Sequence, residues 1–304
     1  MKYIEPASDL RMSNVALGCM RISQLDDSRL NALIDSALEC GINYVDHADI
    51  YGAGQCETLF GKLMSKRPSL RQQLYIQTKC GICSGYYDSS KGHIIESAEN
   101  SLKRLGIDCL DVLLIHRPDV LCQPDEVAEA FERLYSSGKV RCFGVSNHNP
   151  SQIELLRKYM GRNLIINQLQ LSVMHSGMID RGINVNTRFD GATDRDGGVL
   201  DYCRLHNMVL QAWSPFQYGF FEGPFVDCEK FPELNSILGE LAEKYSSTKT
   251  GIASAWITRI PALTQIIAGT TSPDRLKEIA AGAQIDLERP DWYKIYRAAG
   301  NVLP

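Results

Sequence analysis

Short apolar segments rich in β-branched residues alternate with longer amphipathic segments along almost the whole chain. These short segments are mostly apolar, which is typical of strands buried in a parallel sheet. The predicted strands span residues 15–20, 42–48, 74–79, 109–116, 140–146, 164–171, 208–213 and 263–268.

The longer segments carry apolar residues three and four positions apart, which predicts helices with one buried face. In the first of them Leu30, Leu33 and Ile34 share a face, and Gly41 ends the segment. Two long loops are predicted: the polar, glycine-rich stretch 172–198, which has no clear period, and the stretch 217–231, which is rich in aromatic residues and glycine. The predicted helices span residues 28–40, 57–64, 93–105, 125–136, 151–159, 199–206, 232–245, 249–259, 273–281 and 290–299.

Eight predicted strands, each followed by at least one helix, predict a single α/β domain over residues 1–304. We expect a (β/α)8 TIM barrel with extra helices, and with long loops at the carboxyl-terminal face of its strands. An open, doubly wound sheet is the alternative. It is disfavoured because no Gly-x-Gly-x-x-Gly follows the first strand, where Gly18 leads through Cys19 and Met20 to Arg21.

Composition narrows the range of partners. The formal net charge of −4 gives no general attraction to nucleic acid or to an anionic membrane. No apolar run reaches the roughly 20 residues of a membrane span, and residues 1–10 lack the apolar core of a signal peptide. The ten cysteines are scattered through predicted helices and strands, so we expect reduced thiols in a cytoplasmic protein. Because no exposed apolar helix face demands a partner, we expect a monomer.

Ionisable side chains lie where three of the predicted strands end. Asp46 and, just beyond it, Tyr51 follow the second strand, Lys79 ends the third, and His116 ends the fourth. Burying a carboxylate is unfavourable unless it is paired, so Asp46 calls for a cation. Because the carboxyl ends of barrel strands meet at one face, we predict that these four side chains converge there.

The four residue types suit proton donation to a carbonyl oxygen. A free tyrosine has a pKa of about 10 and is a poor acid at neutral pH. A lysine ammonium beside Tyr51 would stabilise its phenolate and lower that pKa, while Asp46 would balance the buried Lys79. His116 could orient the carbonyl oxygen through a hydrogen bond. This combination fits transfer of a hydride from a nicotinamide and of a proton from Tyr51.

At this point the chain resembles a known family, the aldo-keto reductases, through seven ordered motifs between about residues 12 and 285. The motifs are Val45-Asp46-His47-Ala48-Asp49-Ile50-Tyr51-Gly52, Ile76-Gln77-Thr78-Lys79-Cys80-Gly81, Asp111-Val112-Leu113-Leu114-Ile115-His116-Arg117-Pro118, Gly144-Val145-Ser146-Asn147, Asn167-Gln168, Gln211-Ala212-Trp213-Ser214-Pro215 and Ile266-Ile267-Ala268-Gly269-Thr270-Thr271.

The resemblance implies a barrel that binds NADP(H), uses Asp46, Tyr51, Lys79 and His116 as its catalytic tetrad, and reduces a small carbonyl substrate. Its other implied roles concern the cofactor. At the nicotinamide end, Ser146, Asn147 and Gln168 would hold the carboxamide and Trp213 would stack on the ring. Ser214 and the loop that starts at Phe216 would contact the pyrophosphate. At the adenosine end, Gly269, Thr270 and Arg275 would surround the 2′-phosphate and Glu278 would lie near the adenine, while Met20 and Thr271 would complete the binding site.

Some features depart from the family pattern or fit other hypotheses. Gly269 stands where several members carry a lysine for the 2′-phosphate, and Arg275 keeps one positive charge there. Cys80 and Cys83 have the spacing of a redox or metal pair, but no second pair or nearby histidines accompany them, so no metal is predicted. Two alternatives stay open: an aldolase that forms a Schiff base on Lys79, and a cofactor-binding auxiliary or sensor subunit with little turnover.

Overall fold

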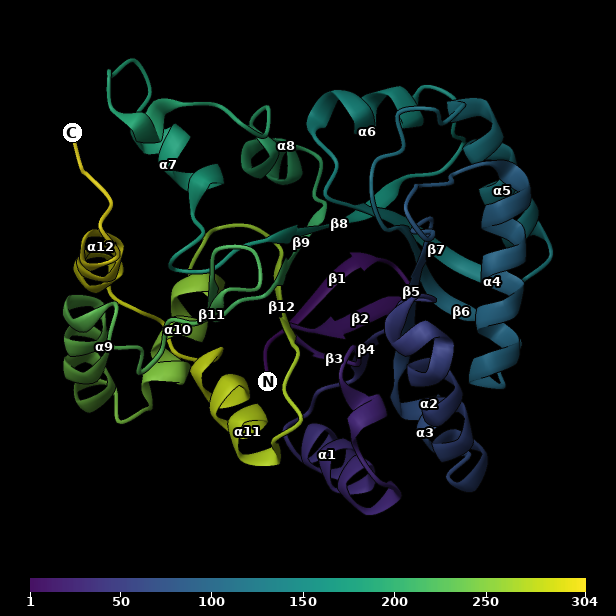
Figure 1. Ribbon diagram of the computed structural model, residues 1–304, viewed down its shortest axis with the longest axis horizontal. Coiled ribbons are helices and arrows are strands. Elements are labelled where there is room, and N and C mark those ends of the chain that lie inside the picture. The colour runs from purple at the N-terminus through teal and green to yellow at the C-terminus, as the bar shows by residue number, and fades with distance from the viewer.

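Eight parallel strands close into a barrel in the computed structural model, which describes residues 1–304 (Figure 1). Each strand pairs in parallel with two neighbours, in the order β12-β3-β4-β5-β6-β7-β8-β9, so the sheet has no free edge. The strands are β3 (Val15–Gly18), β4 (Tyr44–Asp46), β5 (Tyr75–Cys80), β6 (Leu110–Ile115), β7 (Val140–Ser146), β8 (Leu164–Gln170), β9 (Val209–Trp213) and β12 (Thr264–Ala268). The predicted (β/α)8 barrel is confirmed.

Helices follow the strands and surround the barrel (Figure 1). At α6 the Asn149 side chain accepts a hydrogen bond from the backbone of Gln152, whose own side chain bonds back to Asn149, so this helix starts with a capping box. No helix is both long and apolar enough to cross a lipid bilayer. The helices are α1 (Asp27–Glu39), α2 (Gln55–Lys66), α3 (Leu70–Gln73), α4 (Lys91–Leu105), α5 (Pro124–Ser136), α6 (Pro150–Arg157), α7 (Gly177–Ile183), α8 (Val199–Leu205), α9 (Pro232–Lys244), α10 (Lys249–Thr258), α11 (Pro273–Gly282) and α12 (Arg289–Ala298).

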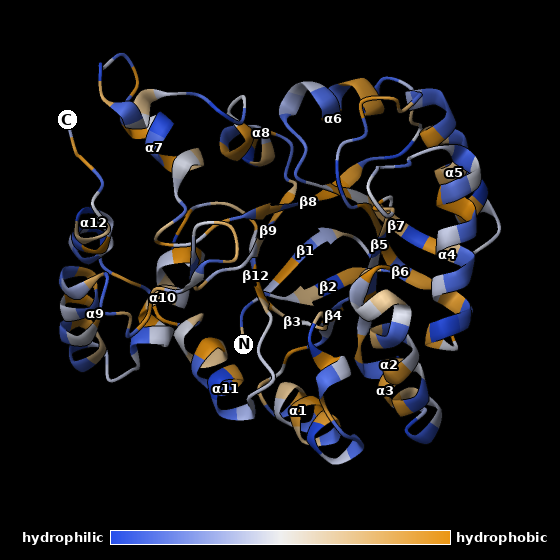
Figure 2. Ribbon diagram, viewed as in Figure 1, coloured by the Kyte–Doolittle hydropathy of each residue, from blue (hydrophilic) through white to orange (hydrophobic).

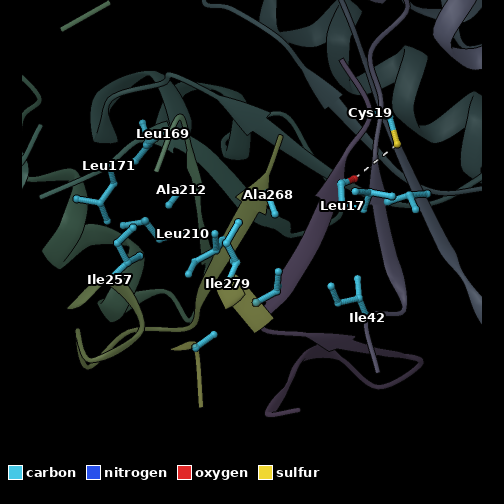
Figure 3. Close-up of a cluster of buried hydrophobic side chains, with 14 of the residues drawn as sticks. Leu17, Cys19, Ile42, Leu169, Leu171, Leu210, Ala212, Ile257, Ala268 and Ile279 are labelled. Atoms are coloured by element: carbon cyan, nitrogen blue, oxygen red, sulfur yellow. Dashed lines mark hydrogen bonds between the residues drawn. The ribbon is translucent and has the colours of Figure 1, made fainter. Parts of the chain in front are cut away.

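The main hydrophobic core lies between the barrel and its helices. Figure 2 shows the strands mostly hydrophobic and the helices banded with hydrophobic and hydrophilic residues, as expected for helices with one buried face. Figure 3 shows Leu17 of β3, Leu210 of β9 and Ala268 of β12 in one cluster of buried hydrophobic side chains with Ile257 of α10 and Ile279 of α11. These buried hydrophobic contacts hold the helices against the outside of the barrel.

A separate, smaller apolar cluster is formed by residues of the strands together with an amino-terminal hairpin. This antiparallel hairpin consists of β1 (Tyr3–Ala7) and β2 (Leu10–Ser13) and contributes Leu10 and Met12. The strands contribute Ala16, Tyr44, Val112, Leu114, Ile166, Val209 and Ile267. The hairpin therefore covers the barrel end opposite to the strand ends that carry the ionisable residues.

Several short segments differ from the prediction, among them α3, where no helix was predicted. The hairpin β1–β2 was not predicted, because strands of 5 and 4 residues are too short for a clear alternating pattern. The stretch 172–198 is not only loop, since it contains α7 and the 3-10 turn Asp190–Ala192. The stretch 217–231 contains a small hairpin of β10 (Gln217–Tyr218) and β11 (Gly223–Pro224). The loop assignment was therefore wrong for these short elements.

Candidate active site

Lys79 lies at the centre of the ionisable residues at the strand ends. Its Nζ is 2.7 Å from Asp46 Oδ1 and donates a hydrogen bond to the Tyr51 hydroxyl over 3.1 Å. It also donates to the backbone carbonyl of His47 over 2.7 Å. The ammonium has three N–H groups, so these three acceptors satisfy it fully. The exposed fractions of Lys79 and Asp46 are 0% and 1%, so the ion pair is shielded from water.

The turn after Tyr51 fixes this side chain at the barrel mouth. Gly52, Ala53 and Gly54 have φ angles of 58°, 52° and 86°, all in the left-handed region. Glycine adopts this conformation readily, whereas for Ala53 it is unfavourable by about 1 kcal/mol or more. Three consecutive left-handed residues bend the chain sharply from the end of β4 into α2. Such stored strain is typical of functional sites.

The charges of Lys79 and Tyr51 at neutral pH depend on their burial and on the electrostatic interaction between neighbouring ionisable groups. Burial opposes the charge of Lys79, but the Asp46 carboxylate and the Tyr51 oxygen outweigh it, so the pKa of Lys79 is raised above 10.5. Burial raises the pKa of Tyr51 above 10, and the Lys79 cation opposes this only in part. The net shift is therefore opposite to the lowered tyrosine pKa expected from the sequence. Tyr51 is a protonated phenol beside a charged ammonium.

His116 faces Tyr51 from the end of β6. The two rings are arranged edge to face with their centroids 6.0 Å apart. Burial, followed by the cations of Lys79 and Arg117, holds the pKa of His116 well below 6.5. The imidazole is therefore neutral at pH 7 and carries one N–H group. Its Nδ1 atom is buried without a hydrogen-bond partner in the chain.

Three polar residues at the ends of β7 and β8 connect this cluster to Trp213. The Ser146 hydroxyl donates to the backbone carbonyl of Gln168 over 2.9 Å and accepts from Asn147 Nδ2 over 2.8 Å. Asn147 has a φ of 60°, and its Oδ1 accepts a hydrogen bond from Trp213 Nε1 over 3.1 Å. Gln168 Nε2 donates to Asp46 Oδ1 over 3.1 Å. The predicted amide-binding residues thus contact both the indole and the buried carboxylate.

The Trp213 ring sits among aromatic and cationic side chains at the rim. Phe221 is nearly parallel to it at 5.9 Å between centroids, and Phe220 meets it edge-on at 6.1 Å. The Arg117 guanidinium lies 5.8 Å from the ring centroid. Phe220 and Phe221 belong to the loop between β10 and β11 and are 64% and 49% exposed. Ser214 follows Trp213 in the sequence and has a φ of 50°, which turns the chain away from the ring.

A second set of residues surrounds the start of α11. The Ser272 hydroxyl accepts a hydrogen bond from the Arg275 backbone, and this caps the helix. A Cβ atom added to Gly269 would meet no atom within 4 Å, so space is open above it. Arg21, which the sequence analysis did not select, reaches over from the end of β3 and donates to the Gly269 carbonyl over 3.3 Å. Open space, two arginines and a helix N-terminus together fit a phosphate group.

The other predicted cofactor residues lie around the same rim. Met20 is 38% exposed, and its carbonyl oxygen accepts from Cys56 Sγ. The hydroxyl of Thr270 accepts from the Ser272 backbone over 3.1 Å, and half-buried Thr271 lies between them. Two positions make contacts within the protein instead of pointing freely outward: Phe216 packs against the main core, and Glu278 accepts from the Thr248 hydroxyl over 3.4 Å.

Three glutamines that were not predicted as site residues lie inside the barrel below Asp46. Gln77 Nε2 donates to Asp46 Oδ1 over 2.5 Å. Gln211 bonds to Gln77 and Gln265. The signal that could have found them is a polar side chain at an inward-facing position of an otherwise apolar strand, since such a group must find a buried partner.

Comparison with known proteins shows the family and the fold of this chain. A family model described as the aldo/keto reductase family matches residues 14–299. The uncharacterized oxidoreductase YcsN of Bacillus subtilis is 35% identical over 98% of this chain and 98% of its own. A 6-dehydroglucose reductase of Agrobacterium fabrum is 31% identical, again over 98% of each chain. The crystal structure of a thermostable aldo-keto reductase, Tm1743, has the same fold, with a TM-score of 0.78, 24% identity, and coverage of 98% of this chain and 100% of the other.

Proposed function

We propose that this chain, which belongs to the aldo/keto reductase family of oxidoreductases, uses NADPH to reduce aldehyde or ketone groups of small molecules to alcohols. The observation that carries the proposal is the buried contact among Asp46, Lys79 and Tyr51, in which Lys79 Nζ lies 3.1 Å from the phenol oxygen. The name of the similar 6-dehydroglucose reductase supports carbonyl reduction as the reaction class.

Each of the four ionisable residues has a distinct task in this proposal. Bound NADPH supplies the hydride that the carbonyl carbon accepts. Tyr51 gives its proton to the carbonyl oxygen, and the Lys79 ammonium stabilises the negative charge left on the phenol oxygen. Asp46 balances Lys79 in the water-excluded site. Neutral His116 donates a hydrogen bond that holds the carbonyl oxygen near Tyr51.

The residues toward Trp213 and α11 would bind the dinucleotide. Ser146, Asn147 and Gln168 hold the nicotinamide carboxamide in this proposal, and Trp213 stacks on the ring. Arg275 and Arg21 supply positive charge for the 2′-phosphate, which favours NADP over NAD. The remaining contacts to the pyrophosphate and adenosine come from Met20, Ser214, Phe216, Gly269, Thr270, Thr271 and Glu278.

The charged state of Lys79 argues against the Schiff-base alternative. A lysine must be a neutral amine to attack a carbonyl carbon. Burial favours the neutral amine, but the Asp46 carboxylate, 2.7 Å away, and the Tyr51 oxygen together outweigh it, so the pKa of Lys79 is raised. Turnover by the isolated chain would separate an enzyme from an auxiliary or sensor subunit.

The substitution Tyr51→Phe tests the proposal. It should lower kcat for NADPH-dependent reduction of 4-nitrobenzaldehyde by a factor on the order of 10³, because it removes the proton donor and keeps the ring. The loss is followed through NADPH absorbance. Binding of NADPH, measured by quenching of tryptophan fluorescence, should stay close to that of the unaltered protein.

Tyr86→Phe is the matched control, since Tyr86 is 62% exposed and lies outside the cluster. It should reduce 4-nitrobenzaldehyde at the rate of the unaltered protein. If Tyr51→Phe kept that rate as well, Tyr51 would not be the general acid.

A further inference from the structure

Four buried glutamines from four strands form a continuous chain of hydrogen bonds across the barrel interior. They are Gln77 of β5, Gln168 of β8, Gln211 of β9 and Gln265 of β12, with exposed fractions of 0%, 2%, 0% and 0%. The chain starts at the backbone carbonyl of Ser13, at the end closed by the hairpin, and it finishes at Asp46. It therefore connects the floor of the barrel to the candidate active site.

Both ends of this chain are obligate acceptors, which fixes how the amides point. Asp46 Oδ1 pairs with the Lys79 cation as a carboxylate oxygen. It therefore accepts from the NH2 groups of Gln77, at 2.5 Å, and Gln168, at 3.1 Å. At the other end, the Ser13 carbonyl accepts from Gln265 Nε2 at 2.6 Å. An amide that faces an acceptor must present its nitrogen, so the orientation of these three amides follows from their partners.

Gln211 joins the two ends. Its Oε1 accepts from Gln77 Nε2 at 2.9 Å and from Gln168 Nε2 at 2.8 Å. Its Nε2 donates to Gln77 Oε1 at 3.1 Å and to Gln265 Oε1 at 2.7 Å. Turning the Gln211 amide by half a turn would place its NH2 against the NH2 groups of Gln77 and Gln168. Such a clash of donors in a buried site is strongly unfavourable, so the network has one stable arrangement.

This arrangement leaves Gln168 with one free polar atom. Both N–H bonds of its amide are used, one on Asp46 and the other on Gln211. Its Oε1 forms no hydrogen bond with the chain. A ligand that meets this side chain therefore meets an acceptor.

We propose that Gln211 is a positioning residue, which together with Gln77 holds Gln168 with its carbonyl oxygen toward the dinucleotide. Gln168 then accepts a hydrogen bond from the NH2 group of the nicotinamide carboxamide. The inference rests on the proposed function and deepens it, because it requires a primary amide on the pyridine ring. The same network holds Asp46, so the buried carboxylate and the cofactor amide are held by one set of side chains.

The test compares NADP⁺ with its 3-acetylpyridine analogue, which keeps the carbonyl oxygen but has a methyl group in place of NH2. Dissociation constants are measured by isothermal titration calorimetry. The unaltered protein should bind NADP⁺ about tenfold more tightly than the analogue, since the analogue leaves the acceptor on Gln168 unmatched. Gln211→Met removes the closer of the two acceptors that hold the Gln168 NH2 group and leaves it on Asp46 alone, over 3.1 Å. The Gln168 amide is then held less firmly, so this preference should fall below about threefold.

Two further variants separate positioning from general damage to the barrel. Gln211→Glu keeps oxygen acceptors for Gln77 and Gln168, so it should keep most of the preference. Gln265→Met removes a buried amide of the same size from the same chain but does not contact Gln168, so it should keep the preference in full. Thermal unfolding followed by circular dichroism checks that each variant is folded.

The outcomes distinguish this inference from the function on which it rests. If Gln211→Met kept the preference of the unaltered protein, or if Gln265→Met lost as much of it, the positioning role would be wrong. Equal binding of NADP⁺ and the analogue by the unaltered protein would also overturn it. Failure of the unaltered protein to bind NADP⁺ or to reduce any aldehyde would instead overturn the proposed function.

Discussion

At the scale of single residues, burial shifts the pKa values of Tyr51 and His116 in opposite directions. Burial raises the pKa of Tyr51 above 10 despite the nearby Lys79 cation. Burial and the nearby cations lower the pKa of His116 well below 6.5. The phenol thus stays protonated and the imidazole stays neutral across the same range of pH. In these states each side chain can donate one hydrogen bond, as the proposed reduction of a carbonyl group requires.

This pairing predicts a flat pH profile for carbonyl reduction. The value of kcat, measured with saturating NADPH and 4-nitrobenzaldehyde, should stay constant from about pH 6 to about pH 9, because neither group titrates there. It should fall only at alkaline pH, as Tyr51 loses its proton. Burial raises the pKa of the nearby Asp49 carboxyl to about 6, so Asp49→Asn is the control. A break between about pH 6 and pH 7 that persisted in Asp49→Asn would mean that His116 titrates like an unburied histidine, and would contradict the shift.

Single site residues could be predicted from the sequence where an ionisable side chain follows an apolar segment. Asp46, Lys79 and His116 stand out because each ends an apolar strand, and the strand pattern alone brings their positions to one face. The glutamines of the barrel interior did not stand out, because a lone Gln in a strand also fits a solvent-facing position. Their network exists only after barrel closure brings β5, β8, β9 and β12 around one axis. The sign of the Tyr51 pKa shift likewise depends on a depth of burial that no pattern reports.

At the scale of elements, α10 and α11 meet at two glycines. A Cβ atom added to Gly282 of α11 would lie 2.3 Å from both the Cα and the carbonyl oxygen of Gly251 in α10. Backbone atoms cannot move aside as a flexible side chain can. The two helices therefore pack at a distance that only glycine permits.

Gly282→Ala should destabilise the protein by about 2 kcal/mol or more, because overpacking outweighs the gain in helix propensity. Urea unfolding measures the change. Gly92→Ala in α4 is the matched control, since its added methyl group would meet no atom within 4 Å. That variant should be neutral or slightly more stable. Similar free energies of unfolding for the two variants would show that the contact between the helices can relax.

Elements were predicted well where a periodic pattern extends over several turns or a full strand. All eight barrel strands follow from apolar runs, and each agrees with the structure to within a few residues. The missed elements are short: β1, β2, β10, β11, α3 and α7. Their stability comes from contacts made elsewhere in the fold, as when the Asn43 side chain accepts from the Ser13 backbone over 2.8 Å, and local sequence does not encode such contacts.

At the scale of the whole molecule, the β1–β2 hairpin closes one end of the barrel, and the ionisable residues lie at the other end. The hairpin places Leu10 and Met12, 3% and 0% exposed, against residues from six of the barrel strands. The glutamine network runs from the Ser13 carbonyl at this end to Asp46, which pairs with Lys79 at the other end. The ionisable side chains of the candidate active site therefore lie at the end opposite to the hairpin. In barrels of this fold, residues at the closed end typically serve stability, and residues at the carboxyl ends of the strands typically form the active site.

Met12→Ala tests this separation. Removing a fully buried methionine from the closed end should lower the free energy of unfolding by about 2–5 kcal/mol, because it leaves a cavity that the hairpin and strands cannot fill. Leu205→Ala, at a position that is 80% exposed, should change stability little. Both variants should reduce 4-nitrobenzaldehyde with the kcat of the unaltered protein under conditions where they are folded. If Met12→Ala lowered kcat while its stability stayed unchanged, the closed end would be part of the catalytic machinery and the two ends would be coupled through the barrel interior.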